Sequence, residues 1–426
     1  MKKLLWVGDA GCPSGFALAT HKIIESLDYR LRGPFDVTVL GLNYRGDGST
    51  ARMYPYDMYA AAVEGDMFGV GRLIWMCDLV KPDVIVIQND PWNFPLYMRQ
   101  LRQFPEYSHV PVVGIVAVDG KNCAGRALNG LAMAIFWTQF GLDEARKGGY
   151  TGPGVVIPLG VDLKTYYPTD KYEARMRRGL PKELDDAFIV GNVNRNQIRK
   201  RWDLTIKYFA EWVHHGPLKD AYLYLHTAPT GDTGIQVPAL AAYYGIAQRL
   251  LLLEPRTFYG STEDEMRDTY NCFDVQISTT QGEGFGLTTF EGMACGVPQI
   301  VPDWSALGEL CKDAARLVPC TSTAVGPPYV NVIGGVADER MFVAEIDALY
   351  KNRTLRERIA GYGYARSHED RFRWASIGEA VRLVTGHVVR CNEDEAAERD
   401  MKAEVELIEA QRVADGLGST ETYEQA

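Results

Sequence analysis

Strand-like and helix-like segments alternate along most of this chain, in two successive sets. Each strand-like segment is a short, nearly continuous apolar run, and the segments between several of them repeat apolar residues at helical spacing. Strands of this composition are typical of parallel sheets that are covered by helices on both faces. The first set has strand-like runs at Lys3–Val7, Phe35–Leu40, Asp83–Gln88, Pro111–Val118 and Ala132–Thr138, and a helical pattern at Ser14–Leu27.

The second set has the same alternation and suggests a second domain. Its strand-like runs are Phe188–Val193, Ala221–His226, Leu250–Leu253, Phe273–Ile277 and Val297–Val301, and its helical patterns are Trp202–His214, Pro238–Tyr244, Ser261–Tyr270 and Gly286–Ala294. Two more helical patterns follow, at Tyr350–Arg366 and Trp374–Val389. A chain of 426 residues is too long for one typical core. We therefore expect an α/β protein with two Rossmann-like domains, at residues 1–165 and 166–370, and a cleft between them.

The stretch Gly282–Pro298 carries the strongest chemical signal. It reads Gly-Glu-Gly-Phe-Gly-Leu-Thr-Thr-Phe-Glu-Gly-Met-Ala-Cys-Gly-Val-Pro, so that two carboxylates, Glu283 and Glu291, stand eight positions apart. A glycine loop between a strand and a helix offers backbone N–H groups and a positive helix end to a phosphate. An ionised carboxylate beside that loop suits sugar hydroxyls, because it is a double acceptor. The stretch therefore indicates a nucleotide-sugar site.

Glu-Gly-Phe-Gly followed by Glu-Gly-Met-Ala-Cys-Gly-Val-Pro resembles the Glu-x7-Glu signature of retaining glycosyltransferases with the GT-B fold, of the family-four type. The resemblance extends over about residues 1–390, and Val155–Asp162 is similar to that family's linker between domains. It implies transfer of a sugar from a UDP- or GDP-sugar to an acceptor hydroxyl with retention of configuration. It also implies a closing helix at residues 371–390 that returns to the first domain, which leaves residues 391–426 as an acidic helical tail.

The resemblance implies separate roles for the two glutamates. Glu283 would contact donor-sugar hydroxyls near the reaction centre, and Glu291 would accept both ribose hydroxyls. The backbone N–H groups of Phe285, Gly286 and Leu287 would reach the diphosphate.

A basic stretch, Asn194–Arg201, follows the first strand-like run of the second set. Negative charge develops on the leaving nucleoside diphosphate, and fixed cations stabilise it most in the transition state. Arg195 and Lys200 match the arginine and lysine that hold the donor diphosphate in the resembled family, although Arg199 and Arg201 flank Lys200 and also fit. Because these cations can replace a metal and no Asp-x-Asp motif has a convincing context, we expect no metal ion and no cofactor besides the donor.

Three further features are candidates for the same site. The glycine loop at residues 8–15 follows the first strand-like run, and the resemblance implies that Gly11 and Gly15 face the donor phosphates, although a plain tight turn explains them nearly as well. Asp119 stands where many relatives carry a histidine that contacts the donor sugar. We expect Asp119 to contact a hydroxyl or orient the acceptor, with a capping carboxylate as the alternative. Arg256–Gly260 follows a strand-like run and would border the base, although its aromatic residues fit a place in the core equally well.

Composition places few limits on the acceptor. The net charge is −10, but residues 391–426 hold 11 acidic and 3 basic residues, so residues 1–390 carry only about −2. The charge therefore does not exclude an anionic acceptor.

The eight cysteines form no CxxC pair and no His/Cys cluster at zinc spacing, so we expect reduced thiols in a cytoplasmic protein. No apolar run approaches the ~20 residues of a membrane span.

The sequence leaves the acceptor, the donor sugar and base, and the oligomeric state open. A glycan, a glycolipid, a protein and a hydroxymethylated DNA base all fit as acceptors. The DNA alternative, a virus-type DNA glycosyltransferase, rests on the sequence around residues 119–130, which is atypical of the resembled family, and on five basic residues: Arg99, Arg102, Arg126, Arg146 and Lys147. Two alternatives of other classes are a sugar-nucleotide epimerase on the same fold and a non-catalytic binding protein.

Overall fold

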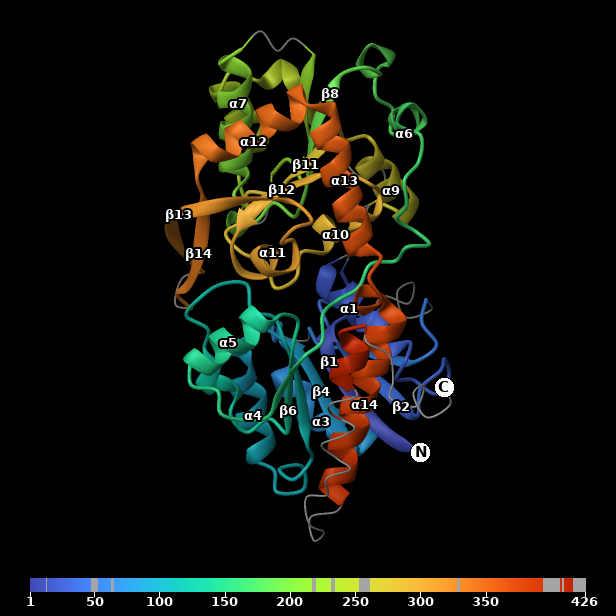
Figure 1. Ribbon diagram of the computed structural model, residues 1–426. Coiled ribbons are helices and arrows are strands. Elements are labelled where there is room, and N and C mark those ends of the chain that lie inside the picture. Colours follow the sequence, from blue (N-terminus) through green and yellow to red (C-terminus); the bar gives the residue numbers. More distant parts are fainter. Residues whose placement is uncertain are drawn as a thin grey trace, which may run out of the picture. The chain divides into compact units, whose positions relative to one another are not determined.

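The computed structural model describes residues 1–12, 14–46, 53–62, 65–216, 220–230, 234–252, 261–327, 330–393, 407 and 410–416. The chain divides into two compact units, and each is described by itself (Figure 1). The first unit comprises Met1–Val118, Asn122–Gly160 and Asp370–Ala426, and the second comprises Asp119–Lys121 and Val161–Glu369. The segment Arg256–Gly260 and most of the tail after Glu393 lie outside the described residues.

The first unit is built on a seven-stranded parallel sheet of order β3-β2-β1-β4-β5-β6-β7. The strands are β1 (Lys2–Asp9), β2 (Phe35–Leu42), β3 (Asp57–Ala60), β4 (Val84–Asn89), β5 (Val112–Val116), β6 (Met133–Phe136) and β7 (Gly154–Val156). Its helices are α1 (Gly15–Ile24), α3 (Val70–Val80), α4 (Phe94–Arg102), α5 (Gln139–Lys147) and α14 (Trp374–Glu393), with short 3-10 turns η1 (Pro91–Asn93), η2 (Gly125–Leu128) and η6 (Asp370–Phe372). Strands β1 and β4 are buried over most of their length, as their apolar composition predicts.

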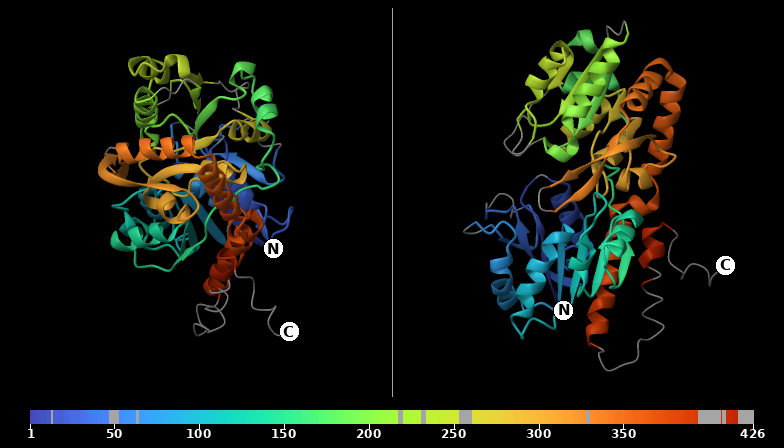
Figure 2. Two further views of the ribbon diagram at one scale, coloured as in Figure 1. Left: turned by 45° about the horizontal axis from the view of Figure 1, so that its top comes forward. Right: turned by 90° about the vertical axis from the view of Figure 1, so that its left-hand side faces the viewer.

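The second unit has a seven-stranded sheet of order β10-β9-β8-β11-β12-β13-β14, parallel except for the antiparallel pair β13–β14. The strands are β8 (Phe188–Val193), β9 (Ala221–His226), β10 (Leu250–Leu252), β11 (Val275–Ile277), β12 (Gln299–Asp303), β13 (Arg316–Gly326) and β14 (Val332–Ala337). The helices are α6 (Lys171–Arg177), α7 (Trp202–His214), α8 (Val237–Tyr243), α9 (Glu263–Asn271), α10 (Leu287–Ala294), α11 (Ser305–Leu310), α12 (Glu339–Lys351) and α13 (Arg353–Ser367), with 3-10 turns η3 (Lys182–Leu184), η4 (Ile198–Lys200) and η5 (Ala247–Arg249). Helices lie on both sides of this sheet (Figure 2).

Parallel strands place the candidate residues of the second unit at one edge of its sheet. Strands β8, β11 and β12 are neighbours, and β8 and β11 end just before the basic stretch and the glycine loop. Because ligands of such sheets bind beyond the carboxyl ends of the strands, this edge is where a site is expected.

Two features of the second unit were not predicted from the sequence. The helix predicted at Tyr350–Arg366 corresponds to α13, but the helix before it, α12, was not expected. Asn352 ends α12 and caps α13, its side chain accepting a hydrogen bond from the Leu355 N–H at 2.9 Å. The long antiparallel pair β13–β14 was not expected, because its residues are partly exposed and carry no continuous apolar run.

None of the eight cysteines, all of them within the described residues, forms a disulfide.

Candidate functional site

Lys200 and Glu283 form a buried ion pair in the second unit. Lys200 closes the η4 turn after β8, Glu283 lies in the glycine loop after β11, and Lys200 Nζ stands 2.5 Å from Glu283 Oε1. Arg199 extends the pair, since its Nη1 lies 3.1 Å from Glu283 Oε2 and its Nε lies 3.2 Å from Asp119 Oδ2. The structure therefore brings together three of the residues that the sequence predicted, Glu283, Lys200 and Asp119, through a fourth, Arg199.

Both members of the pair are charged at neutral pH. Burial alone would raise the pKa of Glu283, but the charges and hydrogen bonds of Lys200 and Arg199 outweigh it and lower the pKa to about 2. Burial lowers the pKa of Lys200 to about 8, against the opposing pull of the Glu283 carboxylate. Such a pair is stable only while both partners are present, because either charge alone would be buried without compensation.

A close backbone approach explains how Asp119 reaches this cluster. A Cβ on Gly282 would lie 1.7 Å from the Asp119 carbonyl oxygen, so only glycine fits there. Lys121 forms an antiparallel bridge with Ile333 of β14, each N–H donating to the other carbonyl at 2.9 and 3.0 Å. The Lys121 ammonium also lies 4.3 Å from the centre of the Trp304 ring. Residues 119–121 are thus held against the glycine loop of the second unit.

Glu291 lies apart from this ion cluster, inside α10. It is 8% exposed, and its Oε2 accepts a hydrogen bond from the Tyr270 hydroxyl. The Tyr166 ring packs edge to face against the Tyr270 ring, with ring centres 5.8 Å apart. Burial raises the pKa of Glu291 to about 7, although the hydroxyls of Tyr270 and Tyr166 act to lower it. Neither tyrosine was singled out from the sequence, where each is one aromatic residue among many.

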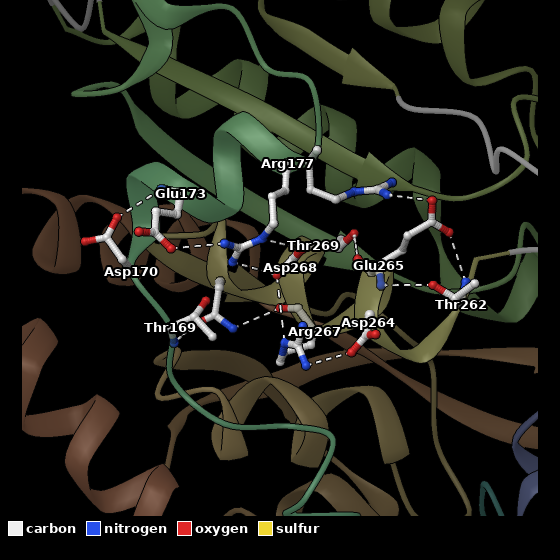
Figure 3. Close-up of polar contacts among 12 residues, drawn as sticks. Thr169, Asp170, Glu173, Arg177, Thr262, Asp264, Glu265, Arg267, Asp268 and Thr269 are labelled. Carbon is white, nitrogen blue, oxygen red and sulfur yellow. Dashed lines mark hydrogen bonds and ion pairs between the residues drawn. The ribbon is translucent and has the colours of Figure 1, made fainter.

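The helix that carries Tyr270 is tied to the preceding segment by polar contacts (Figure 3). Arg177 of α6 donates to both carboxylate oxygens of Asp268 on α9, at 2.8 and 3.0 Å. Asn271 accepts from the Thr169 N–H at 2.7 Å and donates to the Tyr167 carbonyl at 3.1 Å. Because bidentate guanidinium–carboxylate contacts fix the relative orientation of the two groups, the Arg177–Asp268 contact holds α6 against α9. The two Asn271 hydrogen bonds hold residues 167 and 169 against the end of the same helix.

The loop between the two glutamates begins α10. Gly286 is the residue before the helix and has a φ of 102°, which favours glycine. Leu287 opens the helix, so its N–H stands at the positive end of the helix dipole. The Phe285 side chain is 2% exposed and packs against Phe290, with ring centres 4.7 Å apart, so only its backbone is a candidate for ligand contact.

Arg195 lies in the same loop as Lys200 but outside the buried cluster. Its side chain is exposed, and its carbonyl accepts a hydrogen bond from Trp202 Nε1 at 3.0 Å. The contacts with Glu283 and Asp119 belong instead to Arg199, which the sequence offered only as an alternative. Arg201 pairs with Asp203 at 2.8 Å and lies at a positive φ of 52° before α7.

The glycines of the first unit lie where β1 meets α1. A Cβ on Gly11 would stand 2.4 Å from Tyr44 Cα, so close packing by itself requires glycine there. Gly15 opens α1, and Ser14 caps that helix by accepting from the Ala17 N–H at 3.1 Å. Asp9 accepts a hydrogen bond from Ser14 Oγ at 2.5 Å, which ties the loop to the end of β1.

Among the residues that the structure describes, no group of three or more His, Cys, Asp or Glu side chains is placed to hold a metal ion. Within the same described ranges, no helix combines the length and apolar character needed to span a bilayer.

A family model described as family 4 glycosyltransferase in conflict systems matches residues 150–381, more than half of the chain. The chain belongs to this family. The resemblance predicted from the two glutamates is therefore confirmed.

The chain is also similar to curated D-inositol 3-phosphate glycosyltransferases. It is 30% identical to that of Geodermatophilus obscurus over 266 residues, which cover 60% of this chain and 52% of the relative. It is 27% identical to that of Acidothermus cellulolyticus over 268 residues, 62% of this chain and 51% of the relative. The match thus spans about half the length of these relatives.

Solved structures agree with the chain in fold. Sucrose-phosphate synthase from Thermosynechococcus elongatus gives a TM-score of 0.70 at 17% identity, covering 92% of this chain and 100% of that one. HepE from Anabaena, solved in complex with UDP-glucose, gives 0.68 at 17% identity, covering 91% and 100%. The predicted GT-B fold is confirmed.

Proposed function

We propose that this protein is a retaining glycosyltransferase that moves a sugar from a nucleoside diphosphate sugar to an acceptor hydroxyl. The observation that carries the proposal is the buried Lys200–Glu283 pair, 2.5 Å apart, in a family 4 glycosyltransferase. A glycosyl diphosphate needs a cation for its diphosphate and a carboxylate for its sugar hydroxyls, and this pair would supply both. The UDP-glucose complex of HepE makes UDP-sugars the first donors to test.

The basic residues differ in whether a carboxylate already balances their charge, and we give them different roles on this basis. Lys200, Arg199, Glu283 and Asp119 together carry no net formal charge. Arg195, exposed in the same loop, is the further cation that a diphosphate requires. We assign the diphosphate to Lys200 and Arg195, and we assign to Arg199 the task of holding Glu283 and Asp119 in place. The backbone N–H groups of residues 285–287 would add donors at the start of α10.

In the proposed reaction, the bond between the anomeric carbon and the diphosphate oxygen breaks as the acceptor oxygen bonds to the same face. The acceptor proton passes to the leaving phosphate oxygen, so no side-chain base is needed. Lys200 and Arg195 stabilise the charge that develops on the diphosphate, an effect that is largest in the transition state. Glu283 would hold donor-sugar hydroxyls, and Asp119 would contact a hydroxyl or orient the acceptor.

A donor-turnover assay tests this function. The protein would be incubated with a panel of UDP- and GDP-sugars, with and without candidate acceptors, and the free nucleoside diphosphate would be measured. A new nucleotide sugar without diphosphate release would favour the epimerase alternative, and no change to any donor would favour a binding protein. Lys207→Ala is a matched control, because Lys207 also forms an ion pair, with Glu339 at 2.6 Å, away from the cluster.

One observation keeps DNA as a second acceptor class. Arg99, Arg102, Arg126, Arg146 and Lys147 are all exposed, on α4, η2 and α5, and both helices pack against η2. Two of these residues are already engaged, since Arg146 lies over the Tyr150 ring and Lys147 pairs with Glu144 at 2.7 Å.

Salt dependence separates the two classes of acceptor. Contacts with several phosphates weaken steeply between about 50 and 200 mM salt through counterion release. Acceptor turnover that stays level across this range would exclude DNA. A steep loss, removed by Arg99→Ala with Arg102→Ala, would favour it over a neutral glycan.

A further inference from the structure

Ser305 has a backbone conformation that serine rarely adopts. It opens α11 with a φ of 49°, in the left-handed region, where glycine fits best and asparagine, aspartate and histidine are the most frequent other residues. The residue is buried, and the ring of its neighbour Trp304 lies 4.3 Å from the Lys121 ammonium. A Cβ on Gly335 would stand 2.5 Å from the same ring. The surrounding contacts therefore hold Ser305 in a strained conformation.

The Ser305 side chain binds the backbone of Glu283. Its Oγ accepts a hydrogen bond from the Glu283 N–H at 3.0 Å, and the next residue, Ala306, donates its N–H to the Glu283 carbonyl at 3.4 Å. A glycine would adopt the φ of 49° with less strain, but it has no hydroxyl to offer to Glu283. The contact with Glu283 is thus a physical reason for a serine at this position.

The peptide group between Gly282 and Glu283 is fixed at both ends. Its carbonyl oxygen accepts hydrogen bonds from Arg199 Nη1 at 2.8 Å and from Thr280 Oγ1 at 2.9 Å, and its N–H donates to Ser305. Because the plane of this peptide sets the direction in which the Glu283 side chain leaves the backbone, the Ser305 contact helps to aim the carboxylate. Loss of the hydroxyl would leave a buried N–H without this partner, which is costly.

We propose that Ser305 is a positioning residue that fixes the direction of the Glu283 carboxylate, and that this contact is the reason for a strained serine at the start of α11. Strained residues persist where the surrounding contacts determine them, and they gather at functional sites. This inference rests on the proposed function, in which Glu283 holds donor-sugar hydroxyls. It deepens that function by giving a role to a residue outside the basic stretch and the glycine loop.

Two substitutions separate the hydroxyl from the strain. Ser305→Ala removes the hydroxyl and keeps a Cβ in the left-handed conformation, whereas Ser305→Gly removes the hydroxyl and relieves the strain. Both should lower kcat with the preferred donor by about 10- to 100-fold, because small misplacements at a reaction centre cost rate. The affinity for the free nucleoside diphosphate, measured by calorimetry, should stay within a few-fold of wild type in both variants, because Glu283 is assigned to the sugar.

Stability should follow the backbone conformation of the two variants. Glycine is less stable than alanine at an ordinary helical position, but at a φ of 49° the order should reverse. Ser305→Gly should therefore have the higher midpoint in urea unfolding. Ser367→Ala is the matched control, because Ser367 is fully buried in α13 and its hydroxyl donates to the Tyr364 carbonyl at 2.8 Å. That variant should keep the wild-type kcat.

Wild-type kcat in both Ser305 variants would overturn the inference. So would recovery of activity in Ser305→Gly together with its stability, because activity would then follow the strain and not the contact with Glu283. Equal losses of kcat and of diphosphate affinity would indicate a general structural role and would also overturn it. A lower unfolding midpoint for Ser305→Gly than for Ser305→Ala would refute the strain at Ser305. A wild-type protein that releases no nucleoside diphosphate from any donor would instead overturn the proposed function itself.

Discussion

Lys200 Nζ lies 2.5 Å from Glu283 Oε1, and each residue is only 9% exposed. Each charge makes the burial of the other tolerable, so the pair fixes the position of both groups before a donor arrives. Arg199 contacts Glu283 on one side and Asp119 on the other, so that positive and negative side chains alternate through the cluster. In the proposed function, Lys200 would contact the donor diphosphate while still paired with Glu283, which would link the phosphate contact to the sugar contact.

Lys200→Ala and Arg195→Ala should each lower kcat by about 10²- to 10³-fold, because each removes one group that stabilises charge in the transition state. Steady-state kinetics with the preferred donor would measure this, with Lys207→Ala as the unaffected control. Activity within a few-fold of wild type for both variants would place the diphosphate elsewhere. A large loss in Arg199→Ala with none in Arg195→Ala would move the phosphate contact to Arg199.

Glu291 should make the protein less stable as the pH rises toward neutrality. Burial raises the pKa of the folded state to about 7 from an ordinary 4.5, so the folded protein keeps a proton that the unfolded chain loses. The stabilisation is complete below about pH 4.5 and is lost as the pH passes through about 7, with a slope of up to ~1.4 kcal/mol per pH unit. Urea unfolding at pH 5 and pH 8 should show this loss in the wild type and not in Glu291→Gln. An identical pH dependence in both proteins would contradict the assignment.

Gly282→Ala should lower activity, because its new methyl group would push away the Asp119 carbonyl, 1.7 Å from that position. A displacement of about 1 Å near a reaction centre can cost ~10²-fold in rate. Gly361→Ala is the matched control, since Gly361 is exposed on α13 and a Cβ there meets nothing within 4 Å. That change should leave kcat unaltered and stabilise the protein by about 0.5–1 kcal/mol. Full activity of Gly282→Ala would show that residues 119–121 can shift without consequence.

Activity should persist in excess EDTA, because Lys200 and Arg195 supply the positive charge that a divalent ion provides in other transferases. The measurement is donor turnover before and after chelation, followed by addition of Mg²⁺ or Mn²⁺. A clear loss on chelation that either ion restores would overturn this expectation.

Sequence patterns predicted the parts of this molecule that depend on local regularity. Apolar runs predicted strands β8, β11 and β12, and the Glu283–Glu291 spacing indicated the family that the matching family model confirms. Contacts between segments that are far apart in the sequence could not be predicted from such patterns. That Arg199 contacts Glu283, 84 positions away, or that Tyr270 reaches Glu291 depends on side-chain directions that no spacing rule contains.

Asp119–Lys121 belong to the second unit, although the chain on either side of them belongs to the first. The second unit is therefore not encoded by one uninterrupted stretch of the gene. A recombination joined at Gly160 would transfer residues 161–369 without the carboxylate that Arg199 contacts and without the lysine that covers Trp304. A hybrid with a different first unit would have to supply both residues from its own sequence, so this tripeptide limits which first units evolution or engineering can combine with the second.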